Sequence, residues 1–405
     1  MSKSYGKVLG MMLAAALTVS GIGEASPSAY AAKSDFSDIK PAHWAAGAIQ
    51  KAVDKGYVNG YTNGTFKPDA SVSRAEFVKM VVSALNLDAP AASGKWYVPY
   101  VDAATQAGLY AGADFSNNDA GWNKVMTRDE MARVAARAIG EKTGESDKWM
   151  YLATKSGLIQ GVGKAQLAPE GLTTRAQAVV IIERILKANA GDKLAADRYA
   201  VGAAEILWHG TNIFTVMPEK FVTPESDWKS EGKSSIEEMW NEKKMVFTSK
   251  DGQYQGKLDA LVAIDLADPN DPNRGLLGNI DTLKWYNNGA STKDLFVKDN
   301  KNSYVLYFKG QPAFNKNPDK YGAQKELQFN LQGFHNTDMQ SFFAGKLNQT
   351  ARIYRNRSLP SDIPAVIIPK TGTMQNGHNI EIVLQVPIGG SEFKESELLS
   401  LRGIQ

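Results

Sequence analysis

A segment of about fifty residues recurs three times in the first half of the chain, and a period of that length is typical of an array of supersecondary units. Each copy contains two glycines four residues apart, and the first glycines are separated by 52 and 49 residues. An arginine follows the first glycine after 18, 20 and 18 residues. The three sets are Gly56, Gly60 and Arg74; Gly108, Gly112 and Arg128; and Gly157, Gly161 and Arg175. Any fold for this region must therefore accommodate three units in register.

Helical periodicity follows each of the three arginines. Apolar residues occupy the same five offsets in every copy, with the i, i+3, i+4, i+7, i+8 spacing of one buried helical face. A shorter apolar pattern precedes each glycine pair. These patterns predict helix–loop–helix units in which the first glycine ends the first helix in a left-handed conformation. Two short helices cannot bury their apolar faces alone, so we expect the three units to pack into one body.

Each arginine stands inside a capping-box sequence, Ser/Thr-Arg-x-Glu/Gln. The box explains the hydroxyl and the Glu or Gln, because each satisfies a free amide at the start of the helix. It does not explain the arginine, since a cation beside the positive end of a helix dipole costs about 0.3–1 kcal/mol. Two hypotheses account for it. Either the arginine binds an anion at the helix N-terminus, or it forms a structural ion pair, for instance with Asp69 or Asp129.

Further motifs carry a resemblance to a known family. The first copy contains Phe36-Ser37-Asp38, His43-Trp44 and Phe66-Lys67-Pro68-Asp69 ahead of its arginine. Together with the recurring glycines and capping boxes, these motifs resemble the S-layer homology domain, and the resemblance covers residues 36–187. It implies an α-helical pseudo-threefold trimer of helix–loop–helix units, with ligand grooves between neighbouring units. It also implies non-covalent attachment to a secondary cell wall polymer on a bacterial surface, in many members through a pyruvylated amino sugar.

The resemblance assigns ligand contacts to nine residues. It also implies which anion the arginines would bind, namely the carboxylate of a pyruvylated sugar. The nine are Asp38, Trp44, Gly60 and Arg74 in the first unit, Trp96, Gly112 and Arg128 in the second, and Gly161 and Arg175 in the third. For Trp44 and Trp96, filling the hydrophobic core is an equal alternative to stacking on a sugar.

The second unit departs most from the family pattern. It has no Phe-x-Asp motif, and it carries Ala120-Gly121-Trp122 where the first unit has Phe66-Lys67-Pro68. This difference predicts a reshaped or filled groove in the second unit. In the third unit, the helical phase of Trp149 predicts that it packs in the core rather than on a sugar.

The chain divides into six segments. Residues 1–31 are interpreted as a secretory signal peptide, because Lys3 and Lys7 precede an apolar run at 8–19 and Ala29-Tyr30-Ala31 offers a cleavage site. The repeats span 36–87, 96–140 and 145–187, residues 188–204 form a linker or linking helix, and residues 205–405 form the C-terminal domain. The apolar run is too short to cross a bilayer. We therefore expect a protein without membrane insertion, secreted to the bacterial cell wall or S-layer.

The C-terminal domain is predicted to be β-rich, either all-β or α+β, and resembles no family that we identify. Residues 295–308 are predicted to form a hairpin that turns at 299–302, residues 245–266 a strand pair around Asp251-Gly252, and residues 380–386 a strand. Residues 235–244 are predicted to form a helix.

The C-terminal domain shows little catalytic chemistry. The chain has no cysteine, and His209, His335 and His378 fall in no known catalytic spacing. No cofactor is expected, although the aspartates and asparagines of residues 265–273 could ligate calcium; an ordinary turn is the favoured interpretation. The arginines at 352, 355 and 357 form either a contact for an acidic polymer or an ordinary solvated surface.

Two functional hypotheses follow for the whole chain. In the favoured one, the repeats anchor a non-enzymatic S-layer or accessory surface protein, whose C-terminal domain self-associates or binds other surface proteins. In the other, the C-terminal domain is a hydrolase of polysaccharide or peptidoglycan, whose two carboxylates need only meet in space. With 46 basic and 43 acidic residues, the net charge of +3 gives no reason to expect nucleic-acid binding.

Overall fold

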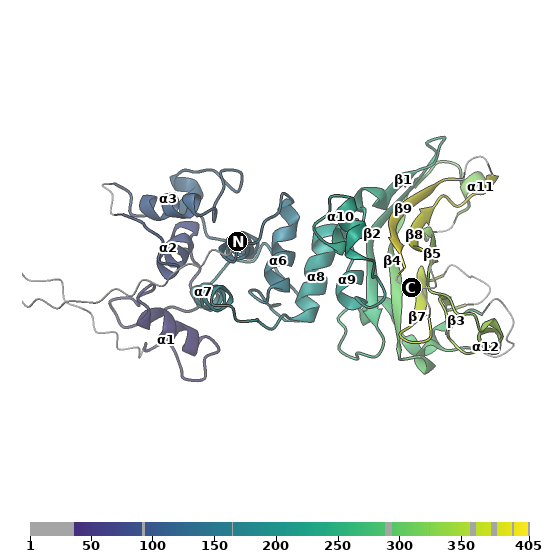
Figure 1. Ribbon diagram of the computed structural model, residues 1–405, viewed down its shortest axis with the longest axis horizontal. Coiled ribbons are helices and arrows are strands. Elements are labelled where there is room, and N and C mark those ends of the chain that lie inside the picture. Colours follow the sequence, from purple (N-terminus) through teal and green to yellow (C-terminus); the bar gives the residue numbers. More distant parts are fainter. Residues whose placement is uncertain are drawn as a thin grey trace, which may run out of the picture.

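The computed structural model describes residues 36–90, 94–163, 165–287, 294–323, 325–356, 362–373, 379–390 and 393–403. The signal peptide predicted at 1–31 therefore lies outside the described residues. Helices occupy the N-terminal half of the chain and antiparallel sheets the C-terminal half, and the two regions lie at opposite ends of an elongated molecule (Figure 1). In the part of the chain that the structure describes, no helix has the length and apolar character needed to span a bilayer.

The second helix of each unit starts at the motif arginine. These helices are α2 (Arg74–Ala84), α5 (Arg128–Ala138) and α7 (Arg175–Asn189). In all three, the N-cap hydroxyl accepts from the N3 amide and the N3 side chain accepts from the N-cap amide, so the predicted capping box is confirmed.

The first helices are α1 (Ala46–Asp54), α3 (Val98–Gln106) and α6 (Trp149–Lys155), the last preceded by the 3₁₀ turn η1 (Ser146–Lys148). The glycine after each has a φ between 72° and 76°, the left-handed conformation that was predicted. The second unit contains one additional helix, α4 (Asp119–Asn123).

A ring of backbone hydrogen bonds joins the three units just before their second helices. The amide of Val72 donates to the carbonyl of Thr173 (3.0 Å), that of Thr173 to Met126 (2.9 Å), and that of Met126 back to Val72 (2.9 Å). Each unit thus donates to one neighbour and accepts from the other. The apolar faces of the six helices bury in one shared cluster around this ring, so the prediction of a single packed body is confirmed for the described residues.

Two antiparallel sheets form most of the C-terminal region. The larger has the order β1-β2-β4-β7-β6-β3, with bounds Val246–Thr248, Tyr254–Asp265, Ser303–Asn315, Ala365–Pro369, Ala351–Tyr354 and Lys284–Trp285. The smaller has the order β5-β8-β9, with bounds Gln328–Gln332, Asn379–Gln385 and Glu395–Arg402. Alternate residues of β2 and β4 enter different clusters: Leu306 and Phe308 face the small sheet, whereas Val262 and Val305 pack on the outer face with Trp285.

Short helices and 3₁₀ turns connect these strands. The helices are α9 (Ile213–Val216), α10 (Glu225–Ser230), α11 (Pro318–Tyr321) and α12 (Met339–Phe343). The turns are η2 (Ile236–Met239), η3 (Glu242–Met245), η4 (Arg274–Leu277), η5 (Ile280–Thr282) and η6 (Val297–Asp299).

Two local predictions for the C-terminal region hold and two are wrong. The strand pair around Asp251-Gly252 forms as β1 and β2, and the strand predicted at 380–386 forms as β8. The predicted hairpin at 295–308 does not form, because η6 turns the chain and β4 then pairs with β2 and β7, which are distant in sequence. The predicted helix at 235–244 is only η2 and η3, since Trp240 between them adopts an extended conformation and its indole donates to the carbonyl of His209.

Helix α8 (Arg198–His209) belongs to both halves of the molecule. It starts inside the predicted linker and continues beyond it. Val201 and Trp208 pack in the core of the repeats, whereas the buried carboxylate of Glu205 accepts from the amides of Phe214 and Thr215 at the start of α9. The two regions are therefore joined by a packed helix, and Figure 1 shows α8 between α6 and the large sheet.

Charged contacts add to this junction. The carboxylate of Glu237 in η2 accepts from Lys155 Nζ (2.6 Å) and from the hydroxyl of Tyr151 (2.8 Å), both on α6. Lys148 forms an ion pair with Glu238. Burial by itself raises the pKa of Glu237, but Lys155 and Ser235 outweigh burial and lower the pKa to about 2.

Glu237→Gln is expected to weaken the junction in a pH-dependent way. A carboxylate with a lowered pKa contributes its full stabilisation above the unfolded-state value of 4.5 and loses it as the pH falls toward about 2. The variant should lose about 1–2 kcal/mol at pH 7. Calorimetry between pH 7 and pH 2 should therefore show a steeper loss of Tm in the wild type than in the variant. Glu225→Gln, which breaks an exposed pair with Lys229, is the control, and parallel pH profiles for Glu237→Gln and wild type would contradict the assignment.

Candidate functional site

The motif arginines are buried and tie each unit to the next. Arg128 donates from Nε to the carbonyl of Leu167 (2.8 Å) and from Nη2 to that of Gln160 (3.0 Å). Arg175 makes the corresponding pair of bonds to the first unit, to Phe66 (2.9 Å) and Asn59 (3.1 Å). These two side chains hold the loop of the neighbouring unit at two points, one just before its second glycine and one six residues after it. Burial lowers the pKa of Arg128.

Arg74 makes a different contact with the second unit. Its guanidinium donates to both oxygens of Glu130 and, from Nη1, to the carbonyl of Gly121 (2.9 Å). The structural ion pair considered from the sequence thus exists for one arginine of three, with Glu130 as its partner rather than Asp69 or Asp129. Arg74, Arg128 and Arg175 are 5%, 5% and 9% exposed. In this structure their guanidiniums donate hydrogen bonds to acceptors of the protein itself.

Trp44 and Trp96 lie on the surface. They are 63% and 50% exposed, so the alternative that they fill the core is wrong. Trp44 stacks on His43 with ring centres 5.7 Å apart, and Lys79 of α2 places its ammonium 5.6 Å from the ring centre of Trp96. Each indole therefore offers a flat apolar face to solvent, which is the surface that the C–H face of a sugar contacts.

Asp38 and Gly60 stabilise the loop of the first unit that leads to Phe66 and Lys67. The carboxylate of Asp38 accepts from the amides of Phe66 (2.8 Å) and Lys67 (2.7 Å). Burial opposes its ionisation, yet these backbone bonds hold the pKa of Asp38 below its ordinary value. A Cβ on Gly60 would lie 2.1 Å from the Phe36 ring, so only glycine fits there. Both residues therefore have a structural role that the family resemblance did not indicate.

One groove brings together Trp44 of the first unit, Arg128 of the second and Gly161 of the third. Gln160, Val162, Gln177, Val180 and Arg184 also line it, and its volume is about 390 Å³. Asp38, Gly60 and Arg175 meet at the loop of the first unit, where the Arg175 guanidinium lies 5.0 Å from the ring of Tyr61, next to Gly60. Arg74 instead contacts Glu130 of the second unit. Gly112 has open space where its Cβ would be.

Arg184 is a groove residue that the family motifs did not identify. Its Nη1 donates to the carbonyl of Leu158 (2.9 Å), and burial lowers the pKa of its guanidinium. Among the described residues, no carboxylate lies within ion-pair distance of it. The sequence does contain a signal for it, because Arg184 follows Arg175 by nine residues just as Arg137 follows Arg128.

The corresponding region of the second unit is filled by its own side chains. Trp122 of α4 is fully buried against Tyr97, Tyr110 and Phe115. The segment that replaces the Phe66-Lys67-Pro68 motif therefore packs into the protein, as predicted. Trp149 is buried as well, with the Arg137 guanidinium 4.7 Å from its ring centre.

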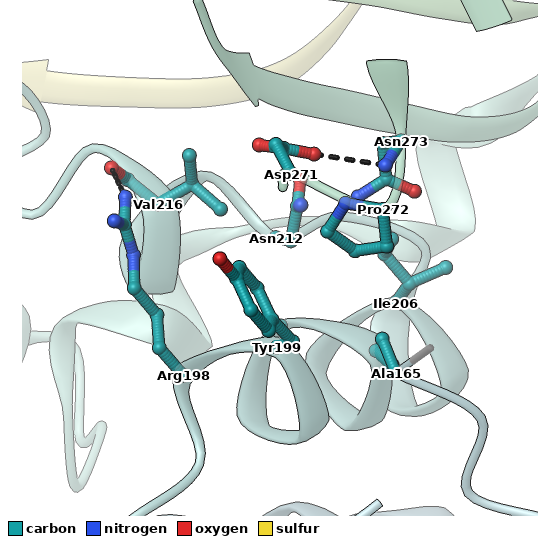
Figure 2. Close-up of a pocket in the computed structure, with 11 residues that line it drawn as sticks. Ala165, Arg198, Tyr199, Ile206, Asn212, Val216, Asp271, Pro272 and Asn273 are labelled. Carbon is teal, nitrogen blue, oxygen red and sulfur yellow. Dashed lines mark hydrogen bonds between the residues drawn. The ribbon is translucent and has the colours of Figure 1, made fainter. Parts of the chain in front are cut away.

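The predicted calcium ligands form turns. Figure 2 shows the small pocket between α8 and this segment, where Asp271 accepts from the amide of Asn273 (2.8 Å) and Arg198 donates to the carbonyl of Val216 (3.2 Å). Asp265 pairs with Lys370 (2.6 Å), and Asp268 accepts from the hydroxyl of Tyr199 (2.7 Å). Within the described ranges, no three His, Asp or Glu side chains are grouped closely enough to hold a metal ion.

The other C-terminal candidates are dispersed. Arg352 donates to the carbonyl of Phe329 (2.6 Å) and Arg355 to that of Leu277 (2.7 Å), so these two arginines support local structure. His209 is buried and stacks on Trp208. Residues 357 and 378, the third arginine and the third histidine of the sequence candidates, lie outside the described residues.

Comparison with known proteins finds a family match for the first unit and similarity to surface proteins. The S-layer homology domain model matches residues 35–78. The chain is 32% identical over 179 residues to an amylopullulanase of Thermoanaerobacterium thermosulfurigenes, covering 38% of this chain and 9% of the relative. It is 30% identical over 199 residues to the surface-layer 125 kDa protein of Lysinibacillus sphaericus (43% and 16%). It is 36% identical over 145 residues to an S-layer protein of Bacillus thuringiensis subsp. finitimus (34% and 17%).

The chain thus spans less than a fifth of the length of each of these relatives. The match to the family model and the similarity to S-layer proteins agree with the motifs and with the helix–loop–helix units described above. Residues 35–78 thus match the S-layer homology domain family, and the similarity to S-layer proteins supports a secreted protein associated with the cell wall at the cell surface.

Proposed function

We propose that the helical region anchors this protein to an acidic secondary cell wall polymer through the groove lined by Trp44, Gly161 and Arg184. The main support is that the exposed indole of Trp44 lies in the same groove, of about 390 Å³, as the Arg184 guanidinium, which pairs with no described carboxylate. Ligand pockets for small molecules typically have volumes of about 300–1,000 Å³. A terminal sugar bearing a pyruvyl carboxylate has the size and the charge for this groove.

Each groove residue has a distinct role in the proposed complex. The Trp44 face stacks on the sugar ring, and the Arg184 guanidinium forms a fork for the carboxylate. The backbone of Gln160 and Gly161 offers polar groups close to the ring. Arg128 positions that backbone through its bond to Gln160, so we assign it a positioning role instead of the direct anion contact that the family resemblance suggested.

The arrangement of the whole anchor is part of the proposal. We infer that the units at 36–87, 96–140 and 145–187 are related by a pseudo-threefold axis, with residues 188–204 leading into the domain at 205–405. The cyclic backbone bonds and the matching contacts of Arg128 and Arg175 support this inference. A second groove at Trp96, Arg175 and Gly60 follows from the same relation, with Lys79 as its cation.

The C-terminal domain is proposed to be an S-layer or accessory surface module that self-associates or binds other surface proteins. One observation favours the alternative of a polysaccharide or peptidoglycan hydrolase. A cleft of about 510 Å³ beside Trp208 and Trp240 is lined by five glutamates: Glu145, Glu231, Glu238, Glu242 and Glu397. If this cleft is catalytic, the purified protein should release reducing sugar from cell wall polysaccharide and Glu397→Gln should abolish the release. Ordered sheets in electron micrographs without any release would favour the structural role.

Trp44→Ala is expected to weaken binding to purified wall sacculi about tenfold, which corresponds to about 1.4 kcal/mol. The stacking surface is lost while the fold is retained, because the indole makes few core contacts. Co-sedimentation with sacculi measures the affinity. Trp44→Phe should keep most of it, and Phe393→Ala, which removes an exposed aromatic from the C-terminal region, is the control. Wild-type affinity in Trp44→Ala would contradict the proposed groove.

Arg184→Gln and Arg128→Gln should separate ligand contact from support. Arg184→Gln is expected to lose sacculus binding with a smaller loss of stability than Arg128→Gln, since only the carbonyl of Leu158 loses a donor. Arg184→Lys should restore binding only in part because lysine lacks the planar fork. Arg128→Gln should lower the stability instead, since the carbonyls of Leu167 and Gln160 lose a buried donor at about 1–3 kcal/mol each. Chemical removal of pyruvate from the polymer should reproduce the effect of Arg184→Gln. Tight binding by Arg184→Gln would overturn its role.

A further inference from the structure

The second unit contains a counterpart of the groove arginine Arg184 of the third unit, with one added carboxylate. Arg137 occupies the position of Arg184, nine residues after the motif arginine, and the two make the same contact. Arg137 Nη1 donates to the carbonyl of Leu109 (3.3 Å), and Arg184 Nη1 donates to that of Leu158 (2.9 Å). Leu109 and Leu158 each follow the first glycine of their units. The two units therefore present equivalent guanidiniums from equivalent places.

Asp114 neutralises the guanidinium of the second unit. Its Oδ1 accepts from Arg137 Nη2 and from Arg133 Nη1, both at 3.1 Å, and its Oδ2 accepts from Arg137 Nη1 and from the amide of Ala111 (2.9 Å). The Asp114 side chain is only 10% exposed. Burial alone raises its pKa, but the two arginines and the amide of Ala111 hold the pKa of Asp114 below its usual range. Both oxygens of this carboxylate are thus fully coordinated.

The backbone conformation after the second glycine explains why the second unit, unlike the third, places a carboxylate beside its arginine. In the other two units the chain turns just after the second glycine, with Tyr61 donating to Thr65 and Val162 to Gln166 (both 2.8 Å). In the second unit the amide of Asp114 instead donates to Ala111 (2.9 Å), which folds the side chain back over α5. By sequence offset the third unit has Gly163 at this place, which has no side chain to offer Arg184.

We propose that Asp114 is a built-in counter-ligand: it occupies, in the second unit, the position that a ligand carboxylate takes beside Arg184 in the third. The Arg133–Arg137 pair is then a latent site for a small carboxylate, closed in the native chain. Arg133 supports this reading, because its Nε is buried and has no acceptor within the described part of the chain. The position of the ligand in the third unit rests on the proposed function, whereas the latent site rests only on the contacts of Asp114.

The latent site should accept a small carboxylate but no sugar. Trp149 lies buried against Arg137, where the third-unit groove has the exposed Trp44. No exposed aromatic face is therefore available for stacking beside Arg137. We infer that the wall polymer does not bind at the Arg133–Arg137 pair, whereas the exposed Trp96 of the same unit belongs to the separate groove proposed with Arg175 and Gly60.

Asp114→Ala in the full chain tests the proposal. Without this carboxylate, Arg137 loses its ion pair while Arg133 keeps only its contact with Asp129 (3.2 Å), so the two adjacent guanidiniums repel each other and the Tm should fall. Sodium acetate or pyruvate should then restore the Tm by about 2–4 °C in a saturable way, while sodium chloride at equal ionic strength should not. If the variant is unfolded in chloride, recovery of the native circular dichroism spectrum in acetate is the equivalent result.

Two controls make the result specific to the arginines. Addition of Arg133→Gln and Arg137→Gln to Asp114→Ala should abolish the acetate response. Asp119→Ala, which breaks an exposed pair with Lys95, should show none. Equal stabilisation of Asp114→Ala by acetate and chloride, or an equal acetate effect on the wild type, would overturn the proposal. These measurements need no wall polymer, so they are independent of whether the wild type binds sacculi.

Discussion

The ring of contacts at the starts of α2, α5 and α7 is the constraint on which the helical region depends. Three amides donate around the ring from unit to unit, and each motif arginine reaches across to the next unit. A buried guanidinium needs acceptors for its donors, and backbone carbonyls of the neighbouring loop supply most of them. The arginine recurs in all three repeats because each unit must hold the loop of its neighbour in place.

Small differences between units decide what each groove can do once the ring is formed. A small residue at position 163 and Arg184, which pairs with no described carboxylate, come from the third unit and meet the exposed Trp44 of the first unit, which leaves a groove open. The second unit uses the same scaffold, but Asp114 and Trp122 occupy it with the protein's own carboxylate and indole. Equivalent sequence positions can therefore line an open groove in one unit and pack inside the protein in another.

Much of the helical region could be predicted from the sequence, because its determinants are local. The apolar period, the capping boxes and the left-handed glycines act within a few residues of one another, and all three recur. The destination of each motif arginine could not be predicted in this way, since Gln160 and Leu167 lie more than thirty residues from Arg128. The exposure of Trp44 was equally undecidable, because an indole near a helix start fits both a core and a surface.

The C-terminal region shows the limit of local patterns most clearly. Strands that pair with near neighbours in sequence, such as β1 with β2, were identified, whereas β4 was given the wrong partner because its two neighbours, β2 and β7, come from distant segments. Helix α8 joins this region to the repeats, because Val201 and Trp208 pack in the core of the repeats and Ile206 packs against the outer cluster of the large sheet. A surface protein held at the wall by its repeats would transmit force through that helix to the sheets.

Titration of the purified chain with a pyruvylated fragment of the wall polymer, followed by NMR of the eight tryptophan indoles, tests the central claim most directly. The account predicts a saturable shift of the Trp44 resonance, with Trp122 and Trp149 unaffected. A saturable shift at Trp122 or Trp149 with none at Trp44 would contradict it.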